Sequence, residues 1–212
     1  QLLPDKNQRD YIMSIDGLST IKGRVHAHTR ELVNRFLRES GHAADFVQHV
    51  PLADINFHQL RKVFLGREHA KGGHDYDKEL AALTRLIQYS RCFDVECTLV
   101  YVAGELEAFL MYELIDSENV LAHFWRANTS HRGLYQAMLN RLCVELCSRG
   151  YRYMNFMQDL GIEGFRSAKA YLRPIAYREK YQLISWRPAQ KPVPRIFRSI
   201  PVAQPLPAIH PY

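Results

Sequence analysis

Hydrophobic residues recur with a helical period in the first half of the chain. Leu32, Val33 and Phe36 fall on one face of a helix, and Gly41 ends that stretch. The same spacing returns twice before residue 90. The pattern predicts helices over residues 21–40, 55–65 and 77–90, with Asp54 capping the second and a short strand over residues 46–52 before it.

The period then shortens to two, which is typical of β-strands. Residues 105–115 alternate apolar positions with glutamates, and Ala103-Gly104 provides a tight turn before them. A helical stripe follows between Gly133 and Gly150. The pattern predicts strands over residues 97–102, 105–115, 119–125, 151–157 and 176–186, and a short helix over residues 165–172.

This order of elements predicts a mixed α/β (α+β) fold, in which a sheet is flanked by helices. Seven of the ten prolines lie after residue 187, so that segment supplies neither a helix nor a central strand. We divide the chain into a linker helix segment (1–43), a single lobe (44–187) and a Pro-rich C-terminal tail (188–212).

The composition is that of a globular protein, with 212 residues, 47% of them hydrophobic and 24% charged. The sequence has no run of about 18 apolar residues and no secretion signal. We therefore expect a soluble cytoplasmic protein and leave association with a membrane surface open. The chain begins with Gln1, so we also expect a processed or truncated product.

The net charge of +6 is concentrated in two segments. Residues 22–38 hold five Lys or Arg and one Glu, and residues 187–198 hold four Lys or Arg and no acid. Such segments indicate an anionic partner such as RNA, an anionic lipid or a nucleotide, although solvated surface arginines give the same pattern. The candidate contacts to tRNA or another anionic partner are Lys22, Arg24, Arg30 and Arg35.

Neither the cysteines nor the histidines form a metal-binding pattern. The four cysteines lack Cys-x-x-Cys spacing, and we interpret them as ordinary buried thiols. They are Cys92, Cys97, Cys143 and Cys147. His26 and His28 have no carboxylate or third ligand nearby, so we expect no metal site.

The junction before the helix at Gly133 is a candidate donor-binding site. Helix N-termini present unpaired amides and the positive end of the helix dipole, which stabilise a phosphate or an oxyanion. Arg132-Gly133 resembles the pyrophosphate-binding turn of the GNAT acyltransferases, without its second glycine; alternatively, the glycine only eases the turn. The candidate donor-binding residues are Arg126, Ser130, His131, Arg132, Gly133, Leu134 and Tyr135.

A longer resemblance lies downstream, in residues 153–174. An Asn on a strand is followed by Asp-Leu-Gly, Gly-Phe-Arg, Ala-Lys, Tyr and Pro, which resembles the closing signature of the phosphatidylglycerol lysyltransferase C-terminal-like family. The residues that match are Asn155, Asp159, Leu160, Gly161, Gly164, Arg166, Ala168, Lys169, Tyr171 and Pro174. The segment from Ile21 to Phe36 is similar to the linker helix of that family.

The resemblance implies a GNAT-like fold related to the Fem-type aminoacyltransferases. Members of this group use aminoacyl-tRNA as donor and a lipid or peptidoglycan-precursor amine or hydroxyl as acceptor, and they usually carry two GNAT-like lobes. This chain shows one lobe and the linker helix, so a further N-terminal lobe is expected as a partner. Trp125-Arg126-Ala127 departs from the Glu-Lys-Ala of the family, which puts donor binding at that position in doubt.

Acyl transfer to an amine needs positioning and a cation near the developing oxyanion. The candidate catalytic residues are therefore Lys169, Arg166 and Asp159; Asp159 either orients a cation or accepts a proton. The alternatives are that Asp159 caps a turn and pairs with Arg166, and that Lys169 is a solvated helix lysine. His123 and His131 are weaker candidates for a base, since a lone histidine is more often structural.

The first functional hypothesis is an acyltransferase that moves an aminoacyl group from aminoacyl-tRNA to a lipid, a peptidoglycan precursor or a small-molecule amine or hydroxyl. It needs no cofactor. The second is an acyl-CoA-dependent N-acyltransferase, and the third is a non-catalytic GNAT-like binding module. Both enzymatic hypotheses require two neighbouring strands to part near residues 125 and 157.

Overall fold

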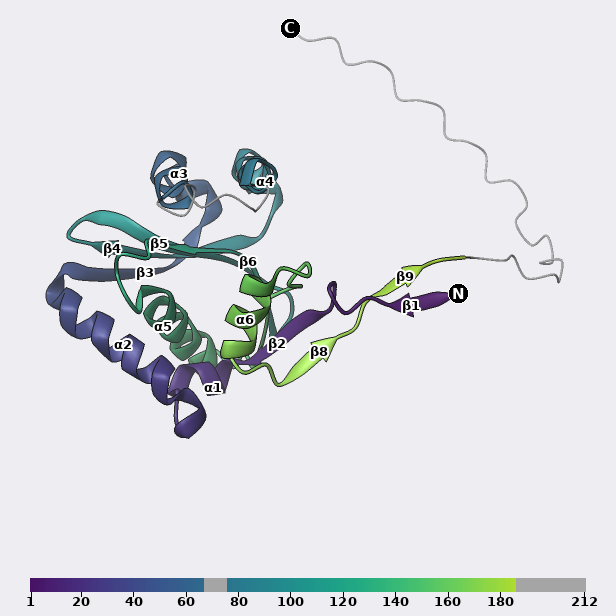
Figure 1. Ribbon diagram of the computed structural model, residues 1–212. Coiled ribbons are helices and arrows are strands. Elements are labelled where there is room, and N and C mark those ends of the chain that lie inside the picture. Colours follow the sequence, from purple (N-terminus) through teal and green to yellow (C-terminus); the bar gives the residue numbers. More distant parts are fainter. Residues whose placement is uncertain (67–75, 186–212) are drawn as a thin grey trace, which may run out of the picture.

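The computed structural model describes residues 1–66 and 76–185. Its centre is a seven-stranded mixed sheet of strand order β3-β4-β5-β6-β7-β2-β8 (Figure 1). The strands of this sheet are β2 (Asp10–Ser14), β3 (Ala44–Pro51), β4 (Val95–Val102), β5 (Glu105–Leu114), β6 (Asn119–Ala127), β7 (Tyr153–Asn155) and β8 (Ala176–Arg178). The predicted Pro-rich tail and the second basic segment lie outside the described residues.

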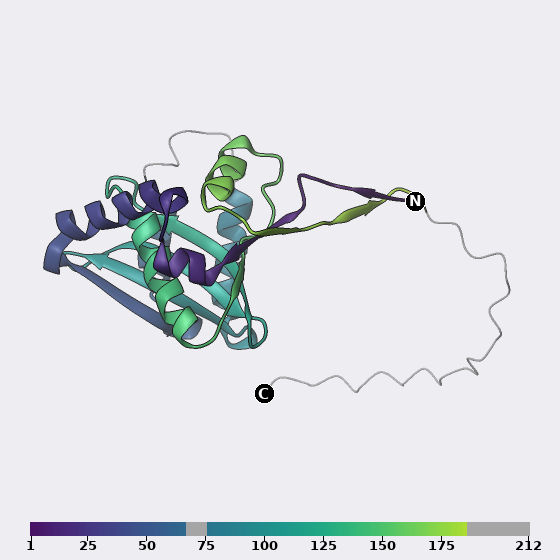
Figure 2. The ribbon, with the colours of Figure 1, turned by 90° about the horizontal axis from the view of Figure 1, so that it is seen from below.

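Helices cover both faces of the sheet, with α1, α2 and α5 on one face and α3 and α4 on the other (Figures 1 and 2). The α-helices are α1 (Ile15–Thr20), α2 (Ala27–Ser40), α3 (Phe57–Phe64), α4 (Tyr76–Gln88), α5 (Leu134–Ser148) and α6 (Glu163–Tyr171). The single-turn 3₁₀ helices are η1 (Arg24–His26), η2 (Gly41–Ala43), η3 (Leu52–Asp54) and η5 (Ser90–Cys92). The mixed α/β fold predicted from the sequence is confirmed.

Each face of the sheet has its own hydrophobic cluster. Leu134, Met138 and Leu142 of α5 are completely buried against one face, and Leu60 and Leu83 are completely buried against the other. These residues belong to the helical stripes read from the sequence. Burial of these stripes is the main force that fixes the helices to the sheet.

The β4–β5 hairpin follows the prediction closely. Ala103 and Gly104 have φ angles of 52° and 81°, and two consecutive positive φ values suit the right-handed twist of the flanking strands. From β6 the chain crosses through α5 to β7, which lies parallel to β6. The other neighbouring pairs of the described sheet are antiparallel.

Four local predictions need correction. Residues 10–14, left unassigned from the sequence, form β2 between β7 and β8. Ile21 has a left-handed backbone that ends α1, so the helix expected over 21–40 begins at Ala27. Asn56, and not Asp54, caps α3, because its side chain accepts from two backbone amides of the first turn. The last strand is two short pieces, β8 and β9 (Tyr181–Leu183).

The division at residue 43 stays a prediction, although β2 and α1 share the sheet and the core with the later elements. The four cysteines differ in burial, and Cys147 is only partly buried. Cys97 and Cys143 are buried, and burial raises the pKa of both thiols. Cys92 is exposed, so its assignment as a buried thiol was wrong.

A two-stranded ribbon leaves the body of the molecule. β1 (Leu2–Pro4) pairs with β9, and both strands project away from the sheet (Figures 1 and 2). Opposite residues of an antiparallel pair share a face, so the apolar side chains form a surface along the ribbon. By this register Leu2, Leu183 and Tyr181 lie on one face of the ribbon, and all three are exposed; Leu3 and Ile184, on the other face, are exposed as well.

Candidate active site

The sheet opens between its only described parallel strands. β6 and β7 pair over three positions, the last of them Leu121 with Asn155. β7 then ends, whereas β6 continues to Ala127 with β5 as its neighbour. This is the parting of strands that the sequence placed near residues 125 and 157.

The opening begins at a β-bulge. The β5–β6 register shifts so that Met111 lies opposite Phe124 and Tyr112 opposite Ala122, which leaves His123 without a partner position. Its Nε2 atom lies 3.2 Å from a carboxylate oxygen of Glu113. This contact orients the imidazole at the point where the strands separate.

Aromatic rings pack together where β6 and β7 part. The Trp125 ring on β6 lies 5.2 Å from the Tyr135 ring on α5 and 5.4 Å from the Phe156 ring that follows β7, measured between centroids. The indole Nε1 of Trp125 is buried and finds no hydrogen-bond acceptor within the part of the chain that the structure describes. It is therefore a buried donor without an acceptor, placed where β6 and β7 part.

Asp159 anchors the turn that follows β7. Its side chain is buried, and it accepts hydrogen bonds from the Tyr11 hydroxyl at 2.5 Å, the Gly161 amide at 2.8 Å and Arg166 Nε at 3.0 Å. Burial alone raises the pKa of Asp159, but the hydrogen bonds from Arg166 and Tyr11 outweigh it and hold the pKa at about 2. Such a carboxylate stays ionised near neutral pH and is a weak proton acceptor.

Lys169 holds the same turn from α6. Its ammonium donates to the carbonyls of Phe156 at 2.7 Å, Met157 at 3.3 Å and Gln158 at 2.5 Å, which occupies all three of its protons. Burial lowers the pKa of Lys169 to about 8, although Asp159 and Asp10 act in the opposite direction. Lys169 is therefore not the solvated helix lysine of the alternative interpretation.

The residues that carry the family resemblance thus form one network. Arg166 also donates to Asn7 at 2.9 Å, and Asn155 donates to Asp10 on β2 at 3.0 Å. The structure brings Lys169, Arg166 and Asp159 together, as expected, and each binds protein groups. The network fixes the end of β7, which forms one wall of the opening.

The candidate donor-binding residues are divided between two sides of the sheet. Arg126 points toward α3 and α4, where it pairs with Glu79 and lies 5.1 Å from the centre of the Phe64 ring. A small pocket there is lined by Val63, Phe64, Gly66 and residues 126–129. Arg126 is thus separated from the rest of the predicted loop.

The loop before α5 is shaped by local contacts. The Ser130 amide and hydroxyl both donate to the Asn128 side chain, at 3.1 and 2.9 Å. His131 lies 3.9 Å from the carboxylate of Glu107, and Arg132 is exposed. These residues form a turn, and within residues 1–66 and 76–185 its exposed cation Arg132 has no ion-pair partner.

The first residues of α5 face the protein interior. Gly133 has a φ of 91°, and a Cβ atom there would lie 2.1 Å from the backbone carbonyl oxygen of Leu32 in α2. Leu134 is completely buried, and Tyr135 contacts Trp125. Gly133 is therefore required by the close approach of α2, and this correction weakens its assignment to a pyrophosphate-binding turn.

The linker cations also differ in their freedom. Arg30 donates to the carbonyl of Ile21 at 2.6 Å and so holds the end of α1, and Arg35 pairs with Glu39 at 2.7 Å. Lys22 and Arg24 are exposed. The structure therefore leaves two of the four predicted anion contacts pointing into solvent.

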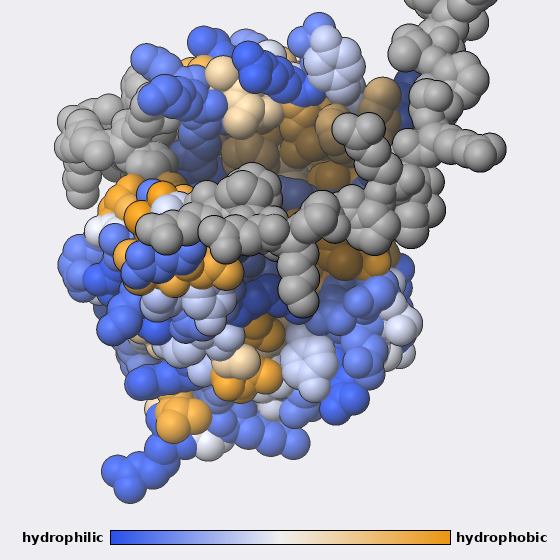
Figure 3. Space-filling model, turned by 90° about the vertical axis from the view of Figure 1, so that its right-hand side faces the viewer, coloured by the Kyte–Doolittle hydropathy of each residue, from blue (hydrophilic) through white to orange (hydrophobic). Residues whose placement is uncertain are grey.

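One side of the molecule combines hydrophobic and hydrophilic surface. Viewed from the side toward which the ribbon projects, hydrophobic residues are set back between hydrophilic residues above and below (Figure 3).

None of the helices in residues 1–66 and 76–185 has the length and apolar character needed to cross a bilayer. Nothing in the sequence marks His123 as a bulge residue, since a bulge depends on register with another strand.

The fold is a mixed sheet that parts between β6 and β7 and is flanked by helices on both faces. The chain matches the family model described as phosphatidylglycerol lysyltransferase, C-terminal, over residues 2–184. The chain belongs to this family. A search of curated proteins gives no match.

Solved structures share the fold. A conserved protein of unknown function from Bacteroides thetaiotaomicron VPI-5482 is 25% identical, with a TM-score of 0.75. The C-terminal domain of a putative lysylphosphatidylglycerol synthetase from Agrobacterium fabrum is 15% identical, with a TM-score of 0.59, and L-PGS from Bacillus licheniformis is 20% identical, with a TM-score of 0.58. Each match covers 85% of this chain but 60% of the other chain, so this chain spans 60% of the length of these proteins.

Proposed function

We propose that this domain transfers an aminoacyl group from aminoacyl-tRNA to an amine or hydroxyl of a lipid, a peptidoglycan precursor or a small molecule. The observation that carries the proposal is the parting of β6 and β7 after Leu121 and Asn155, beside the packed rings of Trp125, Tyr135 and Phe156. Membership of a lysyltransferase family supports it. An aminoacyl ester is already activated, so positioning supplies much of the rate.

In the proposed reaction the acceptor nitrogen or oxygen attacks the ester carbonyl carbon. The bond to the tRNA ribose oxygen breaks, and that oxygen takes a proton as it leaves. His123 accepts the proton of the nucleophile, because Glu113 binds Nε2 and leaves Nδ1 for the substrate. The indole N–H of Trp125 donates to the carbonyl oxygen as its charge grows.

Lys169, Arg166 and Asp159 act in this proposal as positioning residues. Their hydrogen bonds fix the turn after β7 and thereby the place of Phe156 in the wall of the opening. Lys22 and Arg24 attract the tRNA phosphates or the headgroups of an anionic membrane at the cytoplasmic face. Arg126 stays a candidate contact to the donor, through the pocket that it lines with residues 127–129.

A further GNAT-like lobe is part of the proposal. The β1–β9 ribbon exposes Leu2, Leu183 and Tyr181, and a ribbon of two short strands is marginally stable in water unless something covers it. The test is to compare this chain with its longest native form. The proposal expects ribbon amides to exchange more slowly in the longer protein.

The deciding experiment is a donor screen with the longest native form. Charged tRNAs bearing radioactive amino acids and acyl-CoA thioesters are offered with phosphatidylglycerol vesicles or small amines as acceptors. Ribonuclease-sensitive transfer supports the proposal. Transfer from thioesters alone favours an acyl-CoA-dependent enzyme, although the close contact of α2 with Gly133 argues against a pyrophosphate site there. No transfer from any donor favours a binding module.

His123→Gln separates chemistry from binding. It is expected to lower the transfer rate by about 10²-fold or more, with tRNA affinity unchanged. His58→Gln is the matched control, because His58 is exposed on α3. A rate unchanged by His123→Gln would remove the proposed base and leave the donor assignment to the screen.

A further inference from the structure

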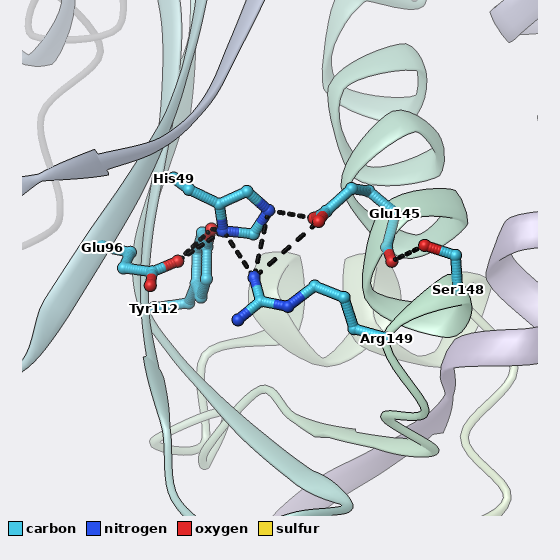
Figure 4. Close-up of polar contacts among 6 residues, drawn as sticks. All are labelled: His49, Glu96, Tyr112, Glu145, Ser148 and Arg149. Carbon is cyan, nitrogen blue, oxygen red and sulfur yellow. Dashed lines mark hydrogen bonds and ion pairs between the residues drawn. The ribbon is translucent and has the colours of Figure 1, made fainter.

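A polar cluster links three strands to α5, at the opposite end of that helix from the candidate site (Figure 4). His49 of β3 places Nδ1 2.5 Å from a carboxylate oxygen of Glu96 on β4, and its Nε2 lies against the carboxylate of Glu145 on α5. The Tyr112 hydroxyl on β5 donates to Glu96 at 3.0 Å. A guanidinium nitrogen of Arg149 lies 2.9 Å from Nδ1 of the ring.

The backbone at His49 is arranged to bring the ring there. The β3–β4 register shifts between Val47 and Val50, so His49 lies in a bulge, and its φ is 56°. A positive φ is uncommon for a residue other than glycine and persists where the surrounding structure enforces it. The bulge aims the ring at α5, across the edge of the sheet.

Both carboxylate contacts of His49 can be hydrogen bonds only when its ring is protonated. A neutral imidazole donates from one nitrogen only, whereas the imidazolium donates from both. With His49 protonated, the charges of His49 and Arg149 balance those of Glu96 and Glu145; without the proton, one negative charge is left over. Tyr112 is completely buried beside them, and burial raises the pKa of its hydroxyl, so it stays a neutral donor.

The same cluster also holds partners for the neutral ring. A deprotonated nitrogen can accept from the Arg149 guanidinium, or from the Tyr112 hydroxyl at 2.8 Å. Arg149 lies 3.8 Å from Glu145 as well, so it can move between the ring and that carboxylate. The two protonation states of His49 therefore select two hydrogen-bond arrangements.

We propose that His49 is a protonation switch that fastens the last turn of α5 to the sheet. The charged ring bridges Glu96 and Glu145 across β3, β4 and α5. The neutral ring gives up one carboxylate, and the last turn of α5 is then held less firmly. That turn leads through Gly150 directly to β7, so local opening of the turn also loosens the start of β7. This inference stands independently of the proposed transfer reaction.

Hydrogen exchange of the amides of residues 146–151 tests the proposal. Exchange is measured in the whole chain at pH 6 and pH 8 and normalised for the intrinsic effect of pH. The normalised exchange is expected to be on the order of tenfold faster at pH 8. His49→Asn is expected to remove the difference, because Asn tolerates a positive φ and does not titrate.

Controls decide between a switch and general loosening. His58→Asn, on the opposite face, should keep the pH dependence of the wild type. Glu145→Gln should abolish it without altering the strained backbone at His49. The proposal is overturned if wild-type exchange is equal at both pH values, or if either His49→Asn or Glu145→Gln keeps the wild-type difference. If His49→Asn fails to fold, Glu145→Gln alone decides the outcome.

Discussion

The hydroxyl of Tyr11 donates a 2.5 Å hydrogen bond to Asp159, 148 residues further along the chain. Both side chains are about 1% exposed. The bond joins β2 to the turn after β7, so the first strand of the sheet and the family signature hold each other in place. Because Arg166 and the Gly161 amide share the same carboxylate, losing Asp159 leaves three donors without this acceptor.

Asp159→Asn is expected to lower the free energy of unfolding by about 2 to 3 kcal/mol, the usual effect of removing a buried, charge-assisted acceptor. Urea unfolding at pH 7 measures it. Asp45→Asn is the matched control, because Asp45 is exposed on β3 and its change should cost less than about 0.5 kcal/mol. Equal stabilities of the two variants would contradict the anchoring role.

The Asp159 carboxylate also leads us to predict a loss of stability at low pH. The pKa of Asp159 is about 2 in the folded chain, below the ordinary value of 3.8, so the unfolded chain takes up the proton first as the pH falls. The stabilisation is complete above pH 3.8 and is lost as the pH falls through 2, about 2 kcal/mol in all. Asp159→Asn should lack this loss when the two proteins are titrated side by side.

For Lys169 we predict that the free energy of unfolding rises at high pH. Burial lowers its pKa from 10.5 to about 8, so the unfolded chain keeps the proton longer as the pH rises. The free energy of unfolding should therefore increase between pH 8 and 10.5 by about 2 to 3 kcal/mol relative to Lys169→Gln. Lys6→Gln, at an exposed lysine, should follow the wild type. A flat difference across this range would show that the ammonium is not desolvated.

Gly133→Ala is expected to destabilise the chain by about 3 kcal/mol or more, since a Cβ there meets the Leu32 carbonyl of α2 at 2.1 Å and φ is 91°. Gly164→Ala on α6 is the control, because nothing lies within 4 Å of its added Cβ. Thermal unfolding of both variants checks the prediction. If Gly133→Ala is as stable as Gly164→Ala, α2 does not lie against α5 in solution.

The exposed linker cations are expected to contribute to tRNA affinity. Lys22→Ala combined with Arg24→Ala should weaken binding and reduce the salt slope by about 1 to 2, whereas Arg35→Ala should change neither, because Arg35 is paired with Glu39. Fluorescence anisotropy at several salt concentrations measures both quantities. Salt-independent binding by the wild type would argue against an RNA partner.

Trp125→Phe removes the indole N–H and keeps an aromatic ring beside Tyr135 and Phe156. Stability should stay the same or rise by about 1 kcal/mol, since a buried donor without an acceptor is removed. The transfer rate should fall by about 10-fold to 10²-fold if the N–H contacts the reacting carbonyl. An unchanged rate would assign Trp125 to packing alone.

The helices and strands whose apolar residues face one core could be predicted from the amino-acid sequence. The stripes of α4 and α5 and the alternation of β5 are set by the period of the backbone, so they could be read without neighbours. The turn at Ala103-Gly104 could be read for the same reason. β2 carries a similar signal, since Tyr11 and Met13 are both buried at a spacing of two, but the segment is short.

The contacts of the polar residues could not be predicted from the sequence, because they depend on how the elements pack together. The bulges at His49 and His123 depend on register with other strands, and the partners of Lys169 and Asp159 come from β2, α6 and the turn after β7. Gly133 looked like part of a phosphate-binding turn until α2 was placed against it. Local periodicity reports which face of an element is buried, whereas hydrogen bonds and charges act between side chains that meet only when the chain has folded.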